Sequence, residues 1–320
     1  MHFSSETKLC ELEAAYPSMK GQFISGGDLF SGDNADLTLS QLHEQHPTWA
    51  VEDMLLGLTN LERAAECGAQ TVWPLPNASM IYLPAEKKQQ RRYAILLAGG
   101  AYGGVCTMVE AMPVAARLNA LGIDCFCLNY RTATPQCFVS GLMPQPLDDL
   151  ADALRLIGEK QDVFAVEPDH YLLAGFSAGG HLASLWGTAS LGARHYGLPQ
   201  PELLALVYPL ITMEHFPDGP AKQYMCSGLF GAGYPPQILR QYDASSNLDA
   251  QYPKTMLVRA LDDTTVPKEN SDYLLRALCD HDIPHRLRQA ETGEHGFGLG
   301  SQTPLRGWVD EAVAFWEEIS

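Results

Sequence analysis

The residues best suited to do chemistry in this chain are a serine, a histidine and a pair of aspartates that lie far apart in the sequence. Ser177 lies in the pentapeptide GFSAG, directly after the apolar run HYLLA and directly before a second apolar stretch. A serine hydroxyl is a poor nucleophile at neutral pH, so it needs a base beside it and exposure to its substrate. His295 in ETGEHGFGLG is the candidate base, and Asp262 or Asp263 in RALDDTTVPKENS is the candidate acid.

The small residues around Ser177 predict a tight turn from a strand into a helix. Such a turn lifts the serine clear of the sheet, strains its backbone and brings its neighbours so close that only small residues fit. Gly175, Ala178, Gly179 and Gly180 meet this demand. G-x-S-x-G alone is a modest signal, and its place between a strand-like and a helix-like segment strengthens it.

The order of the candidates along the chain is serine, acid, histidine, as this type of sheet requires. The aspartates follow a strand-like segment at 254–261, and the histidine follows one at 285–290. Because ligands bind at the carboxyl ends of parallel strands, we expect all three side chains to emerge at one edge of the sheet.

Backbone N–H groups at the same edge could hold a developing oxyanion. LLAGGAYGG follows the predicted strand 93–99, and its glycines let the backbone curl its N–H groups inward. We assign the oxyanion hole to the N–H of Gly100 or Ala101 together with that of Ala178, at the start of the following helix.

A regular alternation of strands and helices from about residue 93 onward would position these residues. Such alternation predicts an α/β fold, with a mostly parallel sheet and helices on both faces. The predicted strands are 93–99, 123–130, 170–176, 203–210, 254–261 and 285–290, and the predicted helices are 109–122, 147–160, 178–191, 267–281 and 305–319.

Two regions do not follow the alternation. Residues 1–70 predict a helical and loop extension, with an amphipathic helix at 48–68, and residues 71–320 predict the catalytic domain. An insertion at about 211–253, rich in Gly, Pro and Tyr, interrupts that domain. Both regions could cover the mouth of the crevice or simply pad the outside of the sheet.

Composition narrows the class of partner. A formal net charge of −17 predicts a surface that repels nucleic acids and anionic membranes, so we expect a neutral or weakly polar small-molecule substrate. No stretch has the length of a signal-peptide core or of a membrane helix, which takes roughly 20 apolar residues. The eight cysteines show no paired framework, which predicts reduced thiols in a cytoplasmic protein.

Other candidate residues carry less information. Cys279, His281 and His285 match no zinc-binding pattern, so we expect no metal and no cofactor. We expect His181, four residues after Ser177, to be packed or hydrogen-bonded behind the site.

Several aromatic and acidic side chains allow two interpretations. Tyr102 and Phe297 lie beside predicted catalytic elements and could line an acyl pocket or simply pack. The tryptophans at 49, 73 and 186 could form a sugar-stacking surface, although packing is favoured. Glu110 and Asp149 are expected to stabilise helix starts.

Five segments resemble the α/β-hydrolase esterases related to hormone-sensitive lipase, in particular the acetyl esterase and acetyl-xylan esterase branch. These segments are LLAGGAYGG, LGIDCFCLNYR, GFSAGGHLAS, ALDDTTVPKENS and GEHGFGL, and the resemblance covers about residues 72–320. It implies hydrolysis of carboxyl esters, with small acyl groups on sugars as one substrate class. By motif matching it implies Ser177 as nucleophile, His295 as base and, through the D-x-x-V-P pattern, Asp263 as acid.

The sequence also departs from that family and admits rivals. The family's oxyanion segment usually opens with His or Pro and runs through three glycines, whereas this one reads AGGAY, so its acyl preference is left open. The first 70 residues match no motif. The D-x-x-V-P stretch also resembles prolyl oligopeptidases. A hydrolase-fold binding protein like the plant gibberellin receptor is the second alternative, although such receptors typically lack the histidine.

Overall fold

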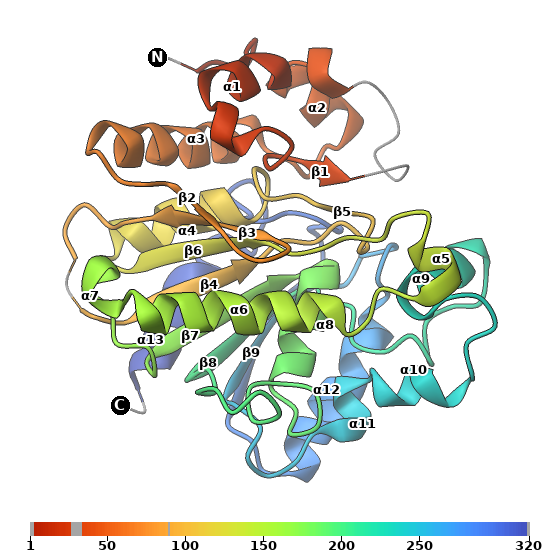
Figure 1. The fold of residues 1–320 in the computed structure, drawn as a ribbon. Coiled ribbons are helices and arrows are strands. Elements are labelled where there is room, and N and C mark those ends of the chain that lie inside the picture. The colour runs from red at the N-terminus through yellow and green to blue at the C-terminus, as the bar shows by residue number, and fades with distance from the viewer. Residues whose placement is uncertain (1–2, 27–33, 89, 319–320) are drawn as a thin grey trace.

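The fold is built on one large sheet, and the computed structural model describes residues 3–26, 34–88 and 90–318. Eight strands lie in the order β10-β9-β8-β7-β4-β6-β3-β2 (Figure 1). From β10 to β6 all neighbours pair in parallel, and β3 and β2 continue the sheet with antiparallel pairing. The strands are β2 (Val72–Pro74), β3 (Ser79–Leu83), β4 (Tyr93–Leu97), β6 (Asp124–Asn129), β7 (Tyr171–Phe176), β8 (Leu203–Val207), β9 (Thr255–Ala260) and β10 (His285–Ala290).

The central strands β4, β7, β8 and β9 consist wholly of buried residues. Strands covered on both faces have near-continuous apolar sequences, which is why these segments are visible in the sequence. Each of the six predicted strands is present, with ends shorter by up to three residues. The mostly parallel sheet confirms the predicted α/β class.

Helices cover both faces of this sheet (Figure 1). The chain steps from β4 to β6 in one direction and returns from β6 to β7 in the other, so right-handed crossovers place α4 and α6 on opposite faces. An ion pair between Arg117 and Asp310 joins α4 to α13. The principal helices are α3 (Val51–Glu66), α4 (Ala111–Ala120), α6 (Gln145–Glu159), α8 (Ser177–Trp186), α9 (Pro220–Phe230), α12 (Lys268–Asp280) and α13 (Trp308–Glu317).

Shorter elements complete the described part of the chain. None of the helices described is long and apolar enough to span a bilayer. These shorter elements are α1 (Leu9–Ala15), η1 (Pro17–Met19), β1 (Ser25–Gly26), η3 (Asn34–Asp36), α2 (Leu39–Gln45), β5 (Gly104–Val105), α5 (Cys137–Ser140), α7 (Gln161–Phe164), α10 (Gln237–Gln241) and α11 (Ala244–Asn247).

The structure differs from the sequence prediction of elements in two places. The helix predicted over 178–191 ends at Trp186, because the chain then folds back so tightly that the Ala193 N–H donates to the Trp186 carbonyl. A Cβ on Gly192 would lie 1.7 Å from that same oxygen. The strands β2 and β3 were not expected, since β2 is short, contains Pro74 and lies at the edge of the sheet.

The N-terminal helices α1, α2 and α3 lie together above the rest of the molecule in Figure 1. Gly57 lets α3 approach α4 closely, because a Cβ there would lie 2.9 Å from the Met112 Cβ. Beside this contact, the buried Asn60 amide donates to Asn119 Oδ1 over 2.7 Å. Asn119 in turn donates to the carbonyls of Leu83 and Ile123, so one side chain ties α3, α4 and the sheet together.

Asn119→Ala is expected to lower the free energy of unfolding by about 1–3 kcal/mol, because it leaves the Asn60 amide and two carbonyls without their buried partner. Urea denaturation followed by circular dichroism measures the change. Asn77→Ala is the control, since Asn77 is exposed in the turn between β2 and β3. Equal losses in the two variants would contradict the role given to Asn119.

Candidate active site

The serine lies on the tight turn that the sequence predicts. Ser177 has a φ of 50° and begins α8 directly after β7. A Cβ on Gly175 would lie 2.3 Å from the carbonyl oxygen of Gly179, and one on Gly179 would lie 2.0 Å from that of Leu97. On Gly180 it would meet a side-chain carbon of Pro209 at 2.7 Å. Small residues are therefore required around Ser177, because larger side chains would overlap with neighbouring atoms.

The loop after β10 brings His295 to this serine. The Ser177 hydroxyl donates to His295 Nε2 over 2.9 Å, and His295 Nδ1–H donates to Asp263 Oδ2 over 2.7 Å. His295 is partly buried, and Asp263 is 7% exposed. The structure therefore brings together three side chains that are separated by up to 118 positions in the sequence.

The two neighbouring aspartates bind different parts of the site. Besides the imidazole, the Asp263 carboxylate accepts the N–H groups of Thr265 and Val266, at 2.9 and 2.8 Å. Asp262 instead accepts the N–H groups of Gly293 and Glu294, at 3.2 and 2.8 Å. Asp263 thus contacts the histidine ring, while Asp262 holds the backbone that leads to it.

The segment after β4 presents N–H groups beside Ser177. Within the described residues, neither the Gly100 nor the Ala101 N–H donates a hydrogen bond. Ala178 lies in the first turn of α8, where N–H groups lack intrahelical partners. Gly99 must be glycine, because a Cβ there would lie 2.7 Å from the Ser177 Cβ. Gly100 has a φ of 134°, and a Cβ on it would lie 2.4 Å from the Gly104 carbonyl oxygen.

A buried carboxylate lies behind this segment, where the sequence suggested only a helix start. Glu110 precedes α4 but its side chain makes no cap hydrogen bond. One carboxylate oxygen accepts the Gly99 N–H, and the other accepts the Tyr208 hydroxyl over 2.9 Å. That hydroxyl also accepts the Gly298 N–H over 2.9 Å. Glu110 therefore connects the oxyanion segment to the loop that carries the histidine.

Burial raises the pKa of the Glu110 carboxyl, and the hydrogen bonds from Gly99 and Tyr208 and the charge of His295 act against this rise. The Tyr208 ring lies 4.8 Å from the His295 ring, centroid to centroid, so it also packs directly beneath the base.

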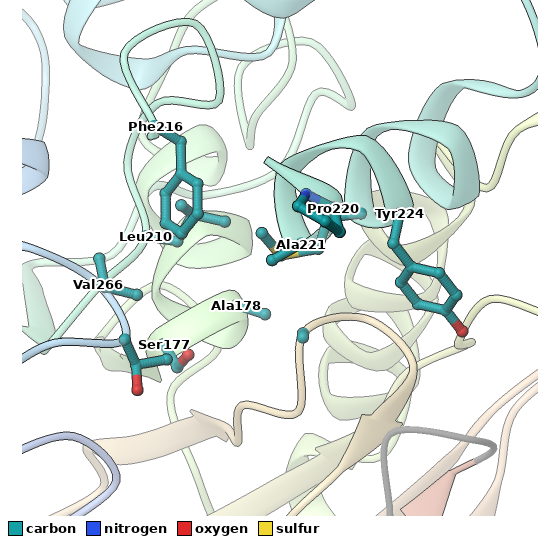
Figure 2. A pocket seen from close by; sticks show the side chains of 11 residues that line it. Ser177, Ala178, Leu210, Phe216, Pro220, Ala221, Tyr224 and Val266 are labelled. Atoms are coloured by element: carbon teal, nitrogen blue, oxygen red, sulfur yellow. The ribbon is translucent and has the colours of Figure 1, made fainter. Parts of the chain in front are cut away.

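Two cavities meet at Ser177, and Ala101 and Thr265 also line both. We call the first the apolar lobe; it has a volume of about 530 Å³. Figure 2 shows Leu210 and Phe216 across this lobe from Ala221 and Tyr224 of α9. The residues that give it its character are Leu210, Phe216, Ala221, Tyr224, Met225 and Val266.

The second cavity, which we call the polar lobe, has a volume of about 350 Å³. It contains the histidine that contacts the serine, whereas the apolar lobe does not. One wall comes from the chain between α2 and α3. The residues that give it its character are Gln45, His46, Thr48, Trp49, Glu294 and His295.

A family model described as BD-FAE matches residues 80–278, more than half of the chain. The chain belongs to the BD-FAE family. An acetylxylan esterase of Xylanibacter ruminicola is 28% identical to it over 207 residues, which are 63% of this chain and 40% of that protein. The chain spans two fifths or less of the length of the curated relatives that it matches.

Solved structures agree with this membership. An acetyl ester-xyloside bifunctional hydrolase from Caldicellulosiruptor lactoaceticus is 29% identical with a TM-score of 0.65, over 76% of this chain and 88% of that one. MGS-M1, an alpha/beta hydrolase from a Medee basin deep-sea metagenome library, is 21% identical with a TM-score of 0.57, over 75% and 92% of the chains, and shows the fold alone. The BD-FAE chain thus has the α/β-hydrolase fold, and the suspected family branch is confirmed.

Of the two interpretations left open for Tyr102 and Phe297, packing is the one that this BD-FAE chain shows, since neither residue lines the two lobes. Tyr102 is 1% exposed, and its hydroxyl lies 2.8 Å from Nδ1 of the buried His181, which confirms His181 as a hydrogen-bonded residue behind the site. Phe297 is 2% exposed and packs edge-on against Tyr208. Both side chains point into the core because the positive φ at Tyr102 and the glycines around Phe297 turn the chain inward.

The structure also bears on what was expected of Asp149, of the three tryptophans and of metal ligands. Asp149 lies inside α6, where it binds the Arg131 guanidinium over 2.8 Å rather than capping the helix start. The three tryptophans form no common surface, since Trp186 is fully buried, Trp73 packs on Phe164 and only Trp49 lines the polar lobe. Across the described residues, no group of three or more His, Cys, Asp and Glu side chains could hold a metal ion.

Glu110→Gln is expected to slow the labelling of Ser177 by a fluorophosphonate about 10-fold to 100-fold, because small displacements of reacting groups carry costs of this order. In one orientation, a glutamine amide would point its NH2 group at the Gly99 N–H. In the other orientation, it would no longer accept the hydrogen bond from the Tyr208 hydroxyl. The second-order labelling rate, followed by gel fluorescence, measures the effect. Glu291→Gln is the matched control, as an exposed carboxylate at the start of the same loop that lines neither lobe. Wild-type labelling by a folded Glu110→Gln variant would contradict the role given to Glu110.

Proposed function

We propose that this chain is a serine hydrolase of carboxyl esters. The observation that carries the proposal is the 2.9 Å hydrogen bond from the Ser177 hydroxyl to an imidazole whose other nitrogen donates to Asp263. Activation of a serine needs a base within this reach and a third group that orients the base. Two relatives of this BD-FAE chain, an acetylxylan esterase and an acetyl ester-xyloside bifunctional hydrolase, support ester hydrolysis as the reaction.

In the first half-reaction, Ser177 Oγ attacks the ester carbonyl carbon while His295 Nε2 takes its proton. Asp263 keeps the imidazole in the tautomer with Nδ1 protonated and stabilises the cation that forms. The N–H groups of Ala178 and of Gly100 or Ala101 stabilise the negative charge on the former carbonyl oxygen. The intermediate then breaks its bond to the alcohol oxygen, which leaves with the proton from His295.

In the second half-reaction, His295 removes a proton from water, and the resulting nucleophile attacks the acyl-enzyme. Ser177 leaves with the proton returned by His295, and the carboxylic acid is released. No cofactor enters either step. The alcohol is absent from this second half, so its structure affects only acylation.

We assign the two halves of the ester to the two lobes from the position of the imidazole. His295 must protonate the leaving alcohol, so the alcohol lies on the side of the polar lobe, the one that His295 lines. The acyl group then extends into the apolar lobe, lined by α9 and the segment before it. We propose acyl esters of carbohydrates, acetyl esters included, as the substrates. This choice rests on the names of two relatives, an acetylxylan esterase and an acetyl ester-xyloside bifunctional hydrolase.

Ser177→Ala is expected to abolish the hydrolysis of p-nitrophenyl acetate, with a drop in kcat of at least about 10³-fold and an unchanged thermal transition. Release of p-nitrophenol measures the rate. A variant that keeps the wild-type rate would rule out the proposed nucleophile.

Two further measurements test the alternative functions. Cleavage of a prolyl amide substrate by the wild type would favour the peptidase alternative. If a fluorophosphonate does not label the wild type, a non-catalytic binding protein would be favoured.

Ala221→Trp is expected to lower kcat/KM for hexanoyl esters about 10-fold or more and to leave acetyl esters within twofold. The tryptophan would fill part of the apolar lobe, and steric differences of a few methylenes are discriminated on this scale. Ala221 is exposed on α9, so the fold should tolerate the change. Gln223→Trp is the matched control, because Gln223 is exposed on the same helix and lines neither lobe. Equal losses for both acyl lengths would contradict this orientation of the ester.

A further inference from the structure

We propose that residues 45–49 select the alcohol half of the substrate, and that the alcohol they accept is a neutral polyhydroxylated one. The inference rests on the proposed function, because it concerns the leaving side of the same ester. These residues lie outside the 80–278 segment that the BD-FAE model matches.

Residues 45–49 lie directly against the loop that carries His295. Gln45, His46, Pro47, Thr48 and Trp49 line the polar lobe together with Ser177 and His295. The Thr48 hydroxyl oxygen and the Trp49 indole nitrogen each lie 3.5 Å from the position that a Cβ on Gly296 would take. The segment therefore forms the wall of the polar lobe that faces the loop carrying His295.

Several interactions hold the segment in place from within. The ring nitrogen Nδ1 of His43 donates to the Trp49 carbonyl over 3.0 Å, and the Trp49 N–H donates to the His46 carbonyl over 2.9 Å. The His46 and Trp49 rings stack with their centroids 4.0 Å apart. A wall fixed in this way can discriminate between ligands, because it does not pay the entropy of ordering when they bind.

Contacts on either side anchor the segment to the protein. Before it, α2 buries Leu39 and Leu42 and begins with a capping box at Thr38. After it, the buried Asp53 carboxylate accepts the Ser301 hydroxyl, just beyond the histidine loop. The Asp53–Ser301 hydrogen bond thus joins the chain that follows the segment to the chain that follows the histidine loop.

The charges around the lobe indicate the kind of alcohol. Its lining includes the exposed carboxylate of Glu294, and within the described residues it includes no lysine or arginine. An anionic alcohol would meet a like charge, whereas a neutral polyol meets the hydroxyls of Thr48 and Thr265 and the amide of Gln45. Aromatic rings beside these polar groups suit the apolar face of a sugar ring.

The test compares two acetyl esters that differ only in the alcohol, acetylated xylotriose and ethyl acetate. Gln45→Trp, which fills the lobe, is expected to lower kcat/KM for acetylated xylotriose about 10-fold, and Thr48→Ala about 3-fold to 10-fold through one lost hydrogen bond. Both variants should leave ethyl acetate within twofold, and both should deacylate at the wild-type rate. Glu44→Trp is the matched control, as the adjacent exposed residue of α2 that lines neither lobe.

Equal losses on both esters, or no loss on either, would overturn the inference while leaving ester hydrolysis intact. Hydrolysis of ethyl acetate but not of the sugar ester by the wild type would overturn it too. A wild-type protein that hydrolyses neither ester would instead refute the proposed function. Wild type should also prefer O-acetylglucose to O-acetylglucuronic acid about 5-fold, as one like-charge contact predicts, and the reverse preference would overturn the neutral class.

Discussion

The site depends on the close approach of α8 to the ends of β4 and β7. A Cβ on Gly179 would lie 2.0 Å from the Leu97 carbonyl oxygen, and one on Gly99 would lie 2.7 Å from the Ser177 Cβ. These contacts leave the serine with a φ of 50°, a conformation that side-chain-bearing residues adopt only under constraint from their surroundings. This strain positions the Ser177 hydroxyl beside the first N–H groups of α8 and the Gly100–Ala101 segment, where the two cavities meet.

The carboxylate of Glu110 extends this constraint to the rest of the site. A fully buried carboxylate is costly unless its oxygens are hydrogen-bonded, and here both accept hydrogen bonds, one from Gly99 and one from Tyr208. Because Tyr208 also receives the Gly298 N–H, displacement of the oxyanion segment would be felt by the loop that carries His295. A buried group that joins two catalytic loops explains why an acid occupies a place that an apolar residue would fill at lower cost.

Sequence patterns predicted the parts of the site that local chemistry determines. The turn at Ser177 was predictable because its steric demand selects a run of small residues in the sequence. The strands were predictable because burial on both faces selects runs of apolar residues. Asp263 and Asp262 could be ranked only through a family pattern, since both follow the same strand. Tyr102, Phe297 and the roles of Glu110 and Tyr208 were not accessible, because each depends on a positive φ or on contacts between residues about 80 to 100 positions apart.

The two regions that broke the regular pattern are the ones that shape the substrate cavities. The apolar lobe takes much of its lining from the 211–253 insertion, and the polar lobe takes one wall from residues 45–49 of the N-terminal extension. No described residue of either region hydrogen-bonds to the side chains of the serine, the histidine or the aspartate, so changes there can alter which ester fits without displacing the reacting atoms. The ends of β4 and β7 and the tight turn at Ser177 allow little variation, because atoms there are in contact. Loops that only border the cavities can vary in length and composition. This separation is the physical basis on which one hydrolase fold can carry many specificities.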